Sequence, residues 1–190
     1  YGLVAWELAK DWTLTLEARY VNEDLTVSCP DTAAIIDPFF LLGSGDTVPP
    51  PANSLTDEDS DSYVVPKATL QWQAQDDIQI YASIGEGVKT SGISTITGGA
   101  AGFEPETYRF DQEKMWAYEL GAKSAWLGGT LTANGAVFYQ DYTDKQAVTQ
   151  VQLANGTIGI GPVNAGSAHV LGMELELNWQ PVEGLLLNLG

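Results

Sequence analysis

Apolar and polar residues alternate one by one along much of this chain, and a period of two is the pattern of a β-strand with one apolar and one polar face. No stretch shows a helical period that competes with it. The pattern is most complete over residues 171–179. Here the apolar set is Leu171, Met173, Leu175, Leu177 and Trp179, and the set between them is Gly172, Glu174, Glu176 and Asn178. The alternation predicts an all-β chain.

The alternation recurs in about eight segments. They cover residues 2–9, 12–21, 64–73, 78–88, 116–123, 131–140, 171–179 and 185–190. Strands that follow each other through tight turns pair antiparallel. We therefore expect one antiparallel sheet of about eight strands.

Short and long connections alternate between these segments. The short ones are Lys10-Asp11, Gln75–Asp77, Leu127–Gly129 and Pro181–Gly184, and the long ones cover residues 28–62, 91–112 and 151–166. Transmembrane β-barrels have short turns on the periplasmic side and long loops outside the cell. A soluble sandwich has no reason to keep that order, so the connections favour a transmembrane barrel.

Tryptophans lie within a few residues of the short turns. They are Trp12, Trp72, Trp126 and Trp179. Amphipathic rings at this height form the interfacial girdle of a membrane barrel. The alternative is that they cover the end of a soluble core. The girdle is favoured because the opposite face is too polar to pack against a second sheet.

That polar face predicts a wet interior. Its residues are Glu17, Arg19, Lys67, Gln71, Glu119, Lys123, Glu174 and Glu176. Burying so many charges in a dry core is costly unless each is paired. Small barrels fill their interior with side chains, whereas wide ones enclose a channel or a plug. We therefore expect these residues to face the lumen of a wider barrel, of which this chain, beginning and ending in mid-pattern, is a fragment.

Composition excludes several other functions. The 25 acidic and 8 basic residues give a net charge of −17, which argues against nucleic acid as a partner. One cysteine, Cys29, and one histidine, His169, allow no internal disulfide and no Cys/His metal site. His169 has no Ser or Cys in a catalytic spacing. We expect no catalytic residue, no bound metal and no cofactor.

Two local motifs are better explained without ligands. The run Asp57–Asp61 resembles the start of a calcium-binding loop, but Ser62 replaces the sixth-position glycine and Ala68 the twelfth-position glutamate. We interpret the run as solvated loop residues. Gly85-Glu86-Gly87 has no helix after it, so phosphate binding has little support.

Four segments, taken in order, resemble one family. YASIGEGVKTSGI (81–93) is similar to a strand and loop of the pattern Y-x-S-x-x-x-G-x-K. FEPETYRFDQEKMWAYELGAK (103–123) is similar to F-x-P-E followed by Y-E-x-G-x-K, with an insertion between the two parts. ANGAVFYQDYTDKQ (133–146) and NAGSAHVLGMELELNWQPVEGLLLNLG (164–190) match two later strands. The order resembles the C-terminal half of the barrel of TonB-dependent outer-membrane receptors. Thr90-Ser91 departs from the frequent Pro-Gly.

The resemblance implies that residues 1–190 are part of a barrel of about 22 strands, with a plug and a TonB-contacting segment outside them. It implies a site in the bacterial outer membrane, among bilayer lipid and lipopolysaccharide, and a monomeric barrel. The implied activity is active uptake of a scarce nutrient, foremost a ferric siderophore. The implied partner is the TonB-ExbB-ExbD complex, reached through the plug.

The aromatic residues of the long loops are the candidate ligand contacts. They are Phe39, Phe40, Phe103 and Tyr108. Such rings can grip an aromatic or apolar chelate, although packing within the loops explains them equally well. Two other functions share parts of the pattern. A passive porin or adhesin would have no plug, and a soluble lectin-like or enzymatic β-domain would have an apolar interior.

Overall fold

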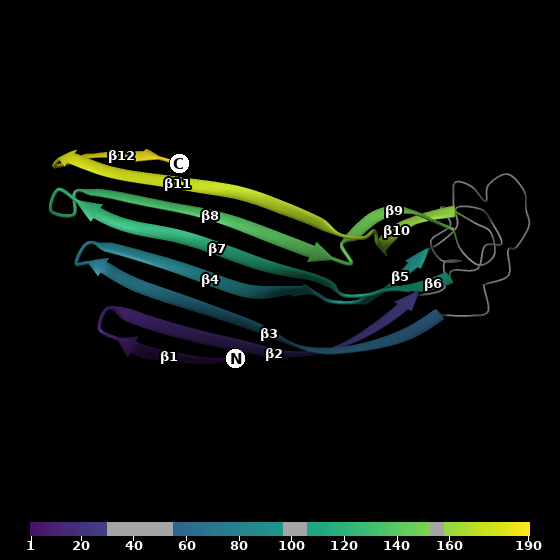
Figure 1. Cartoon of the computed structure of the whole chain (residues 1–190). Helices are drawn as coiled ribbons and strands as arrows, with labels where there is room; N and C mark the ends of the chain where they lie inside the picture. Colours follow the sequence, from purple (N-terminus) through teal and green to yellow (C-terminus); the bar gives the residue numbers. More distant parts are fainter. Residues whose placement is uncertain (30–54, 97–105, 153–157) are drawn as a thin grey trace, which may run out of the picture.

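The described part of the chain is built from β-strands. The computed structural model describes residues 1–29, 55–96, 106–152 and 158–190. Eight strands form one antiparallel sheet in the order β1-β2-β3-β4-β7-β8-β11-β12 (Figure 1). They are β1 (Gly2–Ala9), β2 (Trp12–Cys29), β3 (Leu55–Gln75), β4 (Ile78–Lys89), β7 (Glu113–Trp126), β8 (Leu131–Thr143), β11 (Ala168–Val182) and β12 (Leu185–Leu189). We call this sheet the wall.

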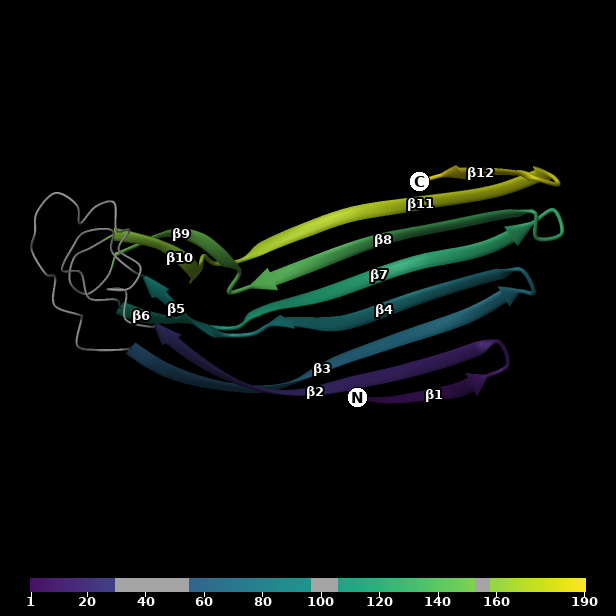
Figure 2. The ribbon, with the colours of Figure 1, turned by 180° about the vertical axis from the view of Figure 1, so that it is seen from behind.

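The wall confirms the predicted antiparallel sheet and its short turns. Each of the eight alternating segments lies in, or largely coincides with, one wall strand. All four short turns lie at the same end of the wall, and the two termini lie at its opposite edges (Figures 1 and 2). The turn after β7 needs backbone of positive φ, which Gly128 (67°) and Gly129 (87°) adopt without a Cβ clash. No helix in the described ranges is long and apolar enough to cross a membrane.

The long connections differ from the prediction. β2 continues to Cys29 and β3 begins at Leu55, so the ends of the expected 28–62 loop are paired strand. The acidic run Asp57–Asp61, interpreted as loop, lies inside β3. The other two connections contain β5 (Gly92–Ile96) with β6 (Glu106–Phe110), and β9 (Gln146–Gln152) with β10 (Ile158–Asn164). In these short segments Val148, Ile158 and Ile160 lie exposed among glycines and polar residues, so the alternation is too incomplete to mark them as strands.

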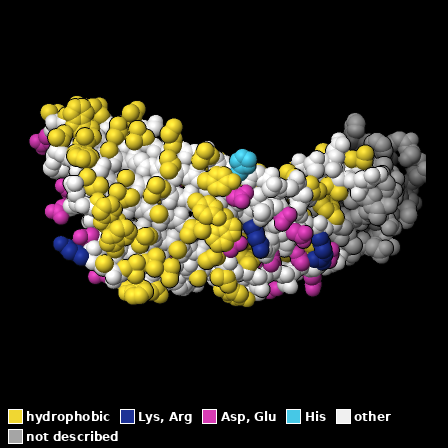
Figure 3. Space-filling model, viewed as in Figure 1, with side chains coloured by type: hydrophobic (Ala, Val, Ile, Leu, Met, Phe, Trp, Pro, Cys, Tyr) yellow, Lys and Arg dark blue, Asp and Glu magenta, His cyan; other side chains and the backbone are white. Residues whose placement is uncertain are grey.

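Cross-strand pairing gives the wall two chemically different faces. Residues directly opposite each other share a face, and Trp12 opposite Trp72 and Leu14 opposite Leu70 place the predicted apolar sets together. Figure 3 shows hydrophobic side chains gathered over the wall, with charged side chains at the turn end and toward β5 and β6. These apolar side chains are exposed; Leu175, for example, is 60% exposed. Their burial requires another apolar phase, as on a membrane-spanning wall.

Aromatic rings bound this apolar face at two levels. The tryptophans mark the turn end, and Trp12 and Trp72 stack with ring centroids 5.4 Å apart. Eight residues further along their strands, Tyr20 follows Trp12 and Tyr118 precedes Trp126. At about 3.3 Å per residue the two levels are about 26 Å apart along a strand. That separation is of the same order as the apolar band of a transmembrane barrel, about 25 Å.

Candidate functional site

The polar face brings the predicted lumen residues together. Alternation and register place all eight on the face opposite the tryptophans. Glu17 lies opposite Lys67, and Lys123 opposite Asn134. That this face lines a lumen stays a prediction, because the described strands form an open sheet.

A hollow of about 440 Å³ lies on the polar face between β2 and β7. Five predicted lumen residues line it, together with smaller hydroxyl and amide groups. The lining residues are Thr15, Glu17, Lys67, Thr69, Gln71, Gln79, Tyr81, Ser83, Glu119 and Lys123. Short hydroxyl side chains from three neighbouring strands alternate with longer charged ones, so the hollow presents hydrogen-bonding groups and both signs of charge.

The Tyr81 side chain lies across the hollow in the space that the opposite residue, a glycine, leaves free. Gly121 is its cross-strand partner, and a Cβ at Gly121 would overlap the tyrosine ring. The absent side chain lets the ring lie along the sheet, where its hydroxyl donates a hydrogen bond to Glu119 at 2.6 Å. Lys123 Nζ lies 5.7 Å from the ring centroid. Glycine and aromatic residues pair in this way in other sheets. The pair therefore orients two of the charged lining groups.

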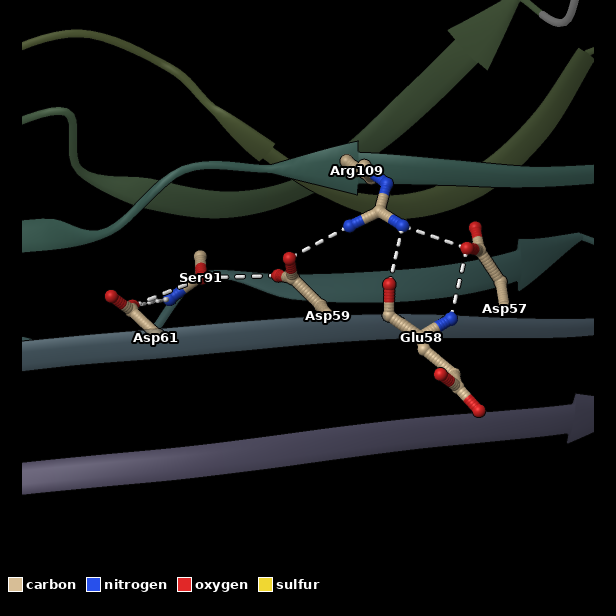
Figure 4. A network of polar contacts seen from close by, with 6 residues as sticks. All are labelled: Asp57, Glu58, Asp59, Asp61, Ser91 and Arg109. Atoms are coloured by element: carbon tan, nitrogen blue, oxygen red, sulfur yellow. Dashed lines mark hydrogen bonds and ion pairs between the residues drawn. The ribbon is translucent and has the colours of Figure 1, made fainter.

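A row of carboxylates continues the polar face above the wall. Asp57, Asp59 and Asp61 occupy alternate positions of β3, so they point to one side. Arg109 of β6 bridges two of them, with 2.7 Å from its guanidinium nitrogens to both Asp57 Oδ1 and Asp59 Oδ1 (Figure 4). It also donates to the Glu58 carbonyl oxygen at 2.6 Å. One planar fork thus binds three acceptors of β3.

The third carboxylate of this row, Asp61, binds the segments that flank the β5–β6 pair. It accepts hydrogen bonds from the Ser91 hydroxyl at 3.0 Å and from the Gln112 side-chain amide at 2.6 Å. Burial raises the pKa of the Asp61 carboxyl, but the hydrogen bonds from Gln112 and Ser91 together outweigh it, so its pKa lies below the ordinary value. The carboxylate is therefore held in its charged form.

A second polar cluster surrounds Glu113 at the start of β7. The Glu113 side chain is 11% exposed. It accepts hydrogen bonds from the Gln146 backbone amide at 2.7 Å and from Lys145 Nζ at 3.5 Å. The Gln146 side chain donates to the Thr90 carbonyl oxygen at 2.8 Å. Asn164 of β10 donates to the carbonyl oxygens of Asp111 and Asp144 and accepts from the Asp111 amide. This cluster connects three short segments, residues 90–91, 111–112 and 144–145, that separate consecutive strands at the end of the wall opposite the short turns.

The predicted ligand aromatics are only partly within the described structure. Phe39, Phe40 and Phe103 lie outside the described residues. Tyr108 lies on β6 and packs against Gly161 of β10, where its hydroxyl is buried without a hydrogen-bond partner in the described structure. The ring is therefore used in contact between two strand pairs, which is the packing alternative weighed for it. A ligand contact at these four residues stays a prediction.

His169 lies where the sequence predicted, at the start of β11. Its ring stacks on Tyr139 of the apolar face, with centroids 6.2 Å apart. Within the described ranges no group of three or more His, Cys, Asp or Glu side chains is placed to hold a metal ion. Arg109, Gln146 and Asn164 were not identified as site residues from the sequence. Their partners lie more than 15 residues away in the chain, so no local spacing could have identified them.

Known proteins are similar to this chain in sequence and in architecture. The family model described as "TonB dependent receptor-like, beta-barrel" matches residues 1–190. The chain is 31% identical to the pesticin receptor of Yersinia enterocolitica over 126 residues. This alignment covers 66% of this chain and 17% of the receptor. The chain thus spans less than a fifth of that relative.

Solved structures show the same arrangement. The ferric yersiniabactin uptake receptor FyuA from Yersinia pestis superposes with a TM-score of 0.64 at 22% identity, over 96% of this chain and 24% of that one. The siderophore receptor PiuA from Acinetobacter baumannii superposes with a TM-score of 0.59 at 19% identity, over 95% of this chain and 22% of that one. At these identities the likeness concerns the fold. In both cases the chain matches about a quarter of the receptor or less.

Proposed function

The chain belongs to the TonB-dependent receptor β-barrel family, and from this premise we propose that it is part of an outer-membrane receptor for the uptake of a ferric siderophore. In this proposal all 190 residues belong to the barrel domain, and the plug and the remaining strands lie outside them. The observation that carries the proposal is the contrast between the two faces of one sheet. One face is apolar and bounded by aromatic rings, and the other carries charged groups around a hollow.

These faces support different roles in transport. The apolar face suits contact with bilayer lipid, and the charges beyond its aromatic rings suit the polar headgroups and lipopolysaccharide. The polar face suits a hydrated interior that offers hydrogen bonds to a plug and to a passing solute. The wall contributes passage and binding rather than covalent chemistry. In this proposal the TonB-ExbB-ExbD complex supplies energy through the plug, and a single barrel is the working unit.

The similar proteins suggest which cargo to test first. One is named a pesticin receptor and another a ferric yersiniabactin uptake receptor. Ferric yersiniabactin is therefore the first probe, followed by ferric catecholates. The loop aromatics Phe39, Phe40, Phe103 and Tyr108 are the proposed contacts for an apolar or aromatic chelate.

The proposal is tested with the complete receptor that contains this chain. It is expressed in an iron-starved host that lacks its own siderophore receptors, with and without a functional TonB. We expect growth on a ferric siderophore only when both receptor and TonB are present. Growth without TonB would instead indicate a passive porin. Absence of uptake for every chelate, with the receptor present at the surface, would favour an adhesin.

A binding measurement tests the aromatic contacts separately. We expect Phe103→Ala to raise the Kd for the transported chelate about 10-fold, because truncating an aromatic side chain that anchors a ligand costs more than about 1 kcal/mol. Trp126→Ala, at the turn end of the wall, is the matched aromatic control and should leave the Kd unchanged. Equal effects of the two substitutions would remove the loop from the binding site.

A further inference from the structure

Three strand pairs are stacked at the end of the wall opposite the short turns. We call the upper part of β2 and β3 (residues 22–29 and 55–62) the post, and the pairs β5–β6 and β9–β10 the two ribbons. β5 contacts β2 and β3, and β10 contacts β5 and β6. The β5–β6 ribbon therefore lies between the post and the second ribbon.

The two faces of the β5–β6 ribbon have different partners. Ile93 and Arg109 are opposite each other and share one face, and Arg109 binds the post. Tyr108 points to the other face and packs against Gly161 of the second ribbon. Ile93, 8% exposed, is the only buried large apolar side chain among the described residues. The contact with the post is thus mainly made of charges and hydrogen bonds.

The ribbons and the post are joined to the wall differently. β2 and β3 pair from Trp12–Trp72 to Cys29–Leu55 without a register shift. In contrast, the first ribbon is separated from the wall by residues 90–91 on one strand and 111–112 on the other. The second ribbon is separated by residues 144–145 and 165–167. Each ribbon therefore leaves the regular strand geometry at the same level on both strands, and such paired breaks permit hinge rotation. Backbone hydrogen bonds from the Lys145 amide to the Gly166 oxygen (2.7 Å) and from the Ala165 amide to the Lys145 oxygen (2.8 Å) bridge the second break, so the second ribbon bends there without separation of its strands.

Hydrogen bonds connect the two sets of breaks. Asn164 binds Asp111 in the first set and Asp144 in the second, with 2.7 to 2.9 Å for all three bonds. The Gln146 side chain also reaches the carbonyl oxygens of Thr90 and Asp111. A rotation of one ribbon about its break would have to carry or rupture these bonds.

We propose that the two ribbons move as one hinged body, which Arg109 latches to the fixed post and which Asn164 and Tyr108 hold together. Release of the latch moves the second ribbon as well as the first, although the side-chain bonds of Arg109 in the described structure go to the post. The body lies on the side of the polar face, since Asp57, Asp59 and Asp61 share that face. The hollow lies on the same face of the wall, closer to the short turns.

The test follows two signals in the complete purified receptor, after Cys29 and any other cysteine have been replaced. Spin labels at Thr26 of the post and Val148 of the second ribbon report the distance between them. Amide hydrogen exchange of the peptide that contains Ser91 reports the latch, because this amide donates to Asp61 at 3.4 Å. We expect Arg109→Ala to speed that exchange and to lengthen and broaden the Thr26–Val148 distance.

Lys114→Ala is the matched control, since Lys114 is an exposed cation of β7 on the face opposite Glu113; it should change neither signal. Labels at Lys10 and Glu183, in two short turns, should keep their distance in every variant and so show an intact wall. Faster exchange at Ser91 with an unchanged Thr26–Val148 distance would mean independent ribbons and overturn the proposal. No change in either signal would mean that Arg109 is not a latch, which overturns it too.

Discussion

Arginine substitutions at two adjacent residues of β11 distinguish a lipid-facing from a water-facing side of the wall. Leu175 lies on the apolar face, midway between Trp179 at the turn end and Leu171 at the other level. In a membrane this is the midplane, where arginine costs about 2–4 kcal/mol in a barrel. We expect Leu175→Arg to reduce the equilibrium constant for folding by about 30-fold to 900-fold.

Glu176 is the adjacent position on the polar face. Its carboxylate accepts hydrogen bonds from Asn178 at 2.9 Å and Asn134 at 3.3 Å, both exposed to solvent. Water replaces these bonds in Glu176→Arg, so the cost should be much smaller than at Leu175. Leu187→Arg serves as a depth control, because Leu187 lies opposite Trp179 at the level of the rings. There the cost should be only about 0–1 kcal/mol.

The assay is folding of the complete receptor into phospholipid vesicles at increasing urea concentrations. The folded fraction is measured from the mobility of unheated samples in detergent gels. The expected order of destabilisation is Leu175→Arg first, then Leu187→Arg and Glu176→Arg close to the unmodified receptor. Equal destabilisation at Leu175 and Glu176 would refute the assignment of the two faces and return a soluble β-domain to consideration.

Two further predictions concern single contacts. Gly121→Ala places a Cβ inside the space of the Tyr81 ring, so we expect a loss of about 1–3 kcal/mol in the same folding assay; Gly135→Ala, whose Cβ would be 3.7 Å from its nearest neighbour, should be close to neutral. Because the pKa of Asp61 is lowered, its bonds stabilise the fold above the ordinary carboxyl pKa and are lost as the pH falls through the lowered value. The protection factor of the Ser91 amide, which compares its exchange rate with the intrinsic rate at the same pH, should accordingly fall only in that acidic range, and Asp61→Asn should abolish this change in protection.

The wall could be predicted from the sequence because its two faces carry side chains of different polarity. From Trp12 to Tyr20, and from Leu171 to Trp179, every second residue is apolar, and the register confirms the faces that this implies. A lipid phase on one side and water on the other imposes the period of two directly. The short turns followed from the same pattern, as the segments where it stops.

The upper strands could not be predicted in the same way. Apart from Leu25, the residues Asn22–Thr26 and Asp57–Ser62 are polar on both faces, so alternation disappears although the backbone ladder continues. The paired breaks at residues 90–91 and 111–112 were hidden inside a stretch rich in glycine and threonine. The Arg109 contacts depend on long-range pairing, which a single sequence does not reveal.

The difference between an unbroken post and interrupted ribbons has a consequence for insertions and deletions. A strand transmits its register, and a shift of one residue turns every following side chain to the other face. Deleting Ser60 would therefore reverse Asp57 and Asp59 relative to the wall and take them away from Arg109. An insertion or deletion in β5 or β6, beyond residues 90–91 and 111–112, shifts the register only within that ribbon. The register of the wall stays intact. The ribbons are thus segments in which length can vary during evolution or engineering without a shift in the register of the wall, whereas a change of length within the post shifts the register of every post residue beyond it.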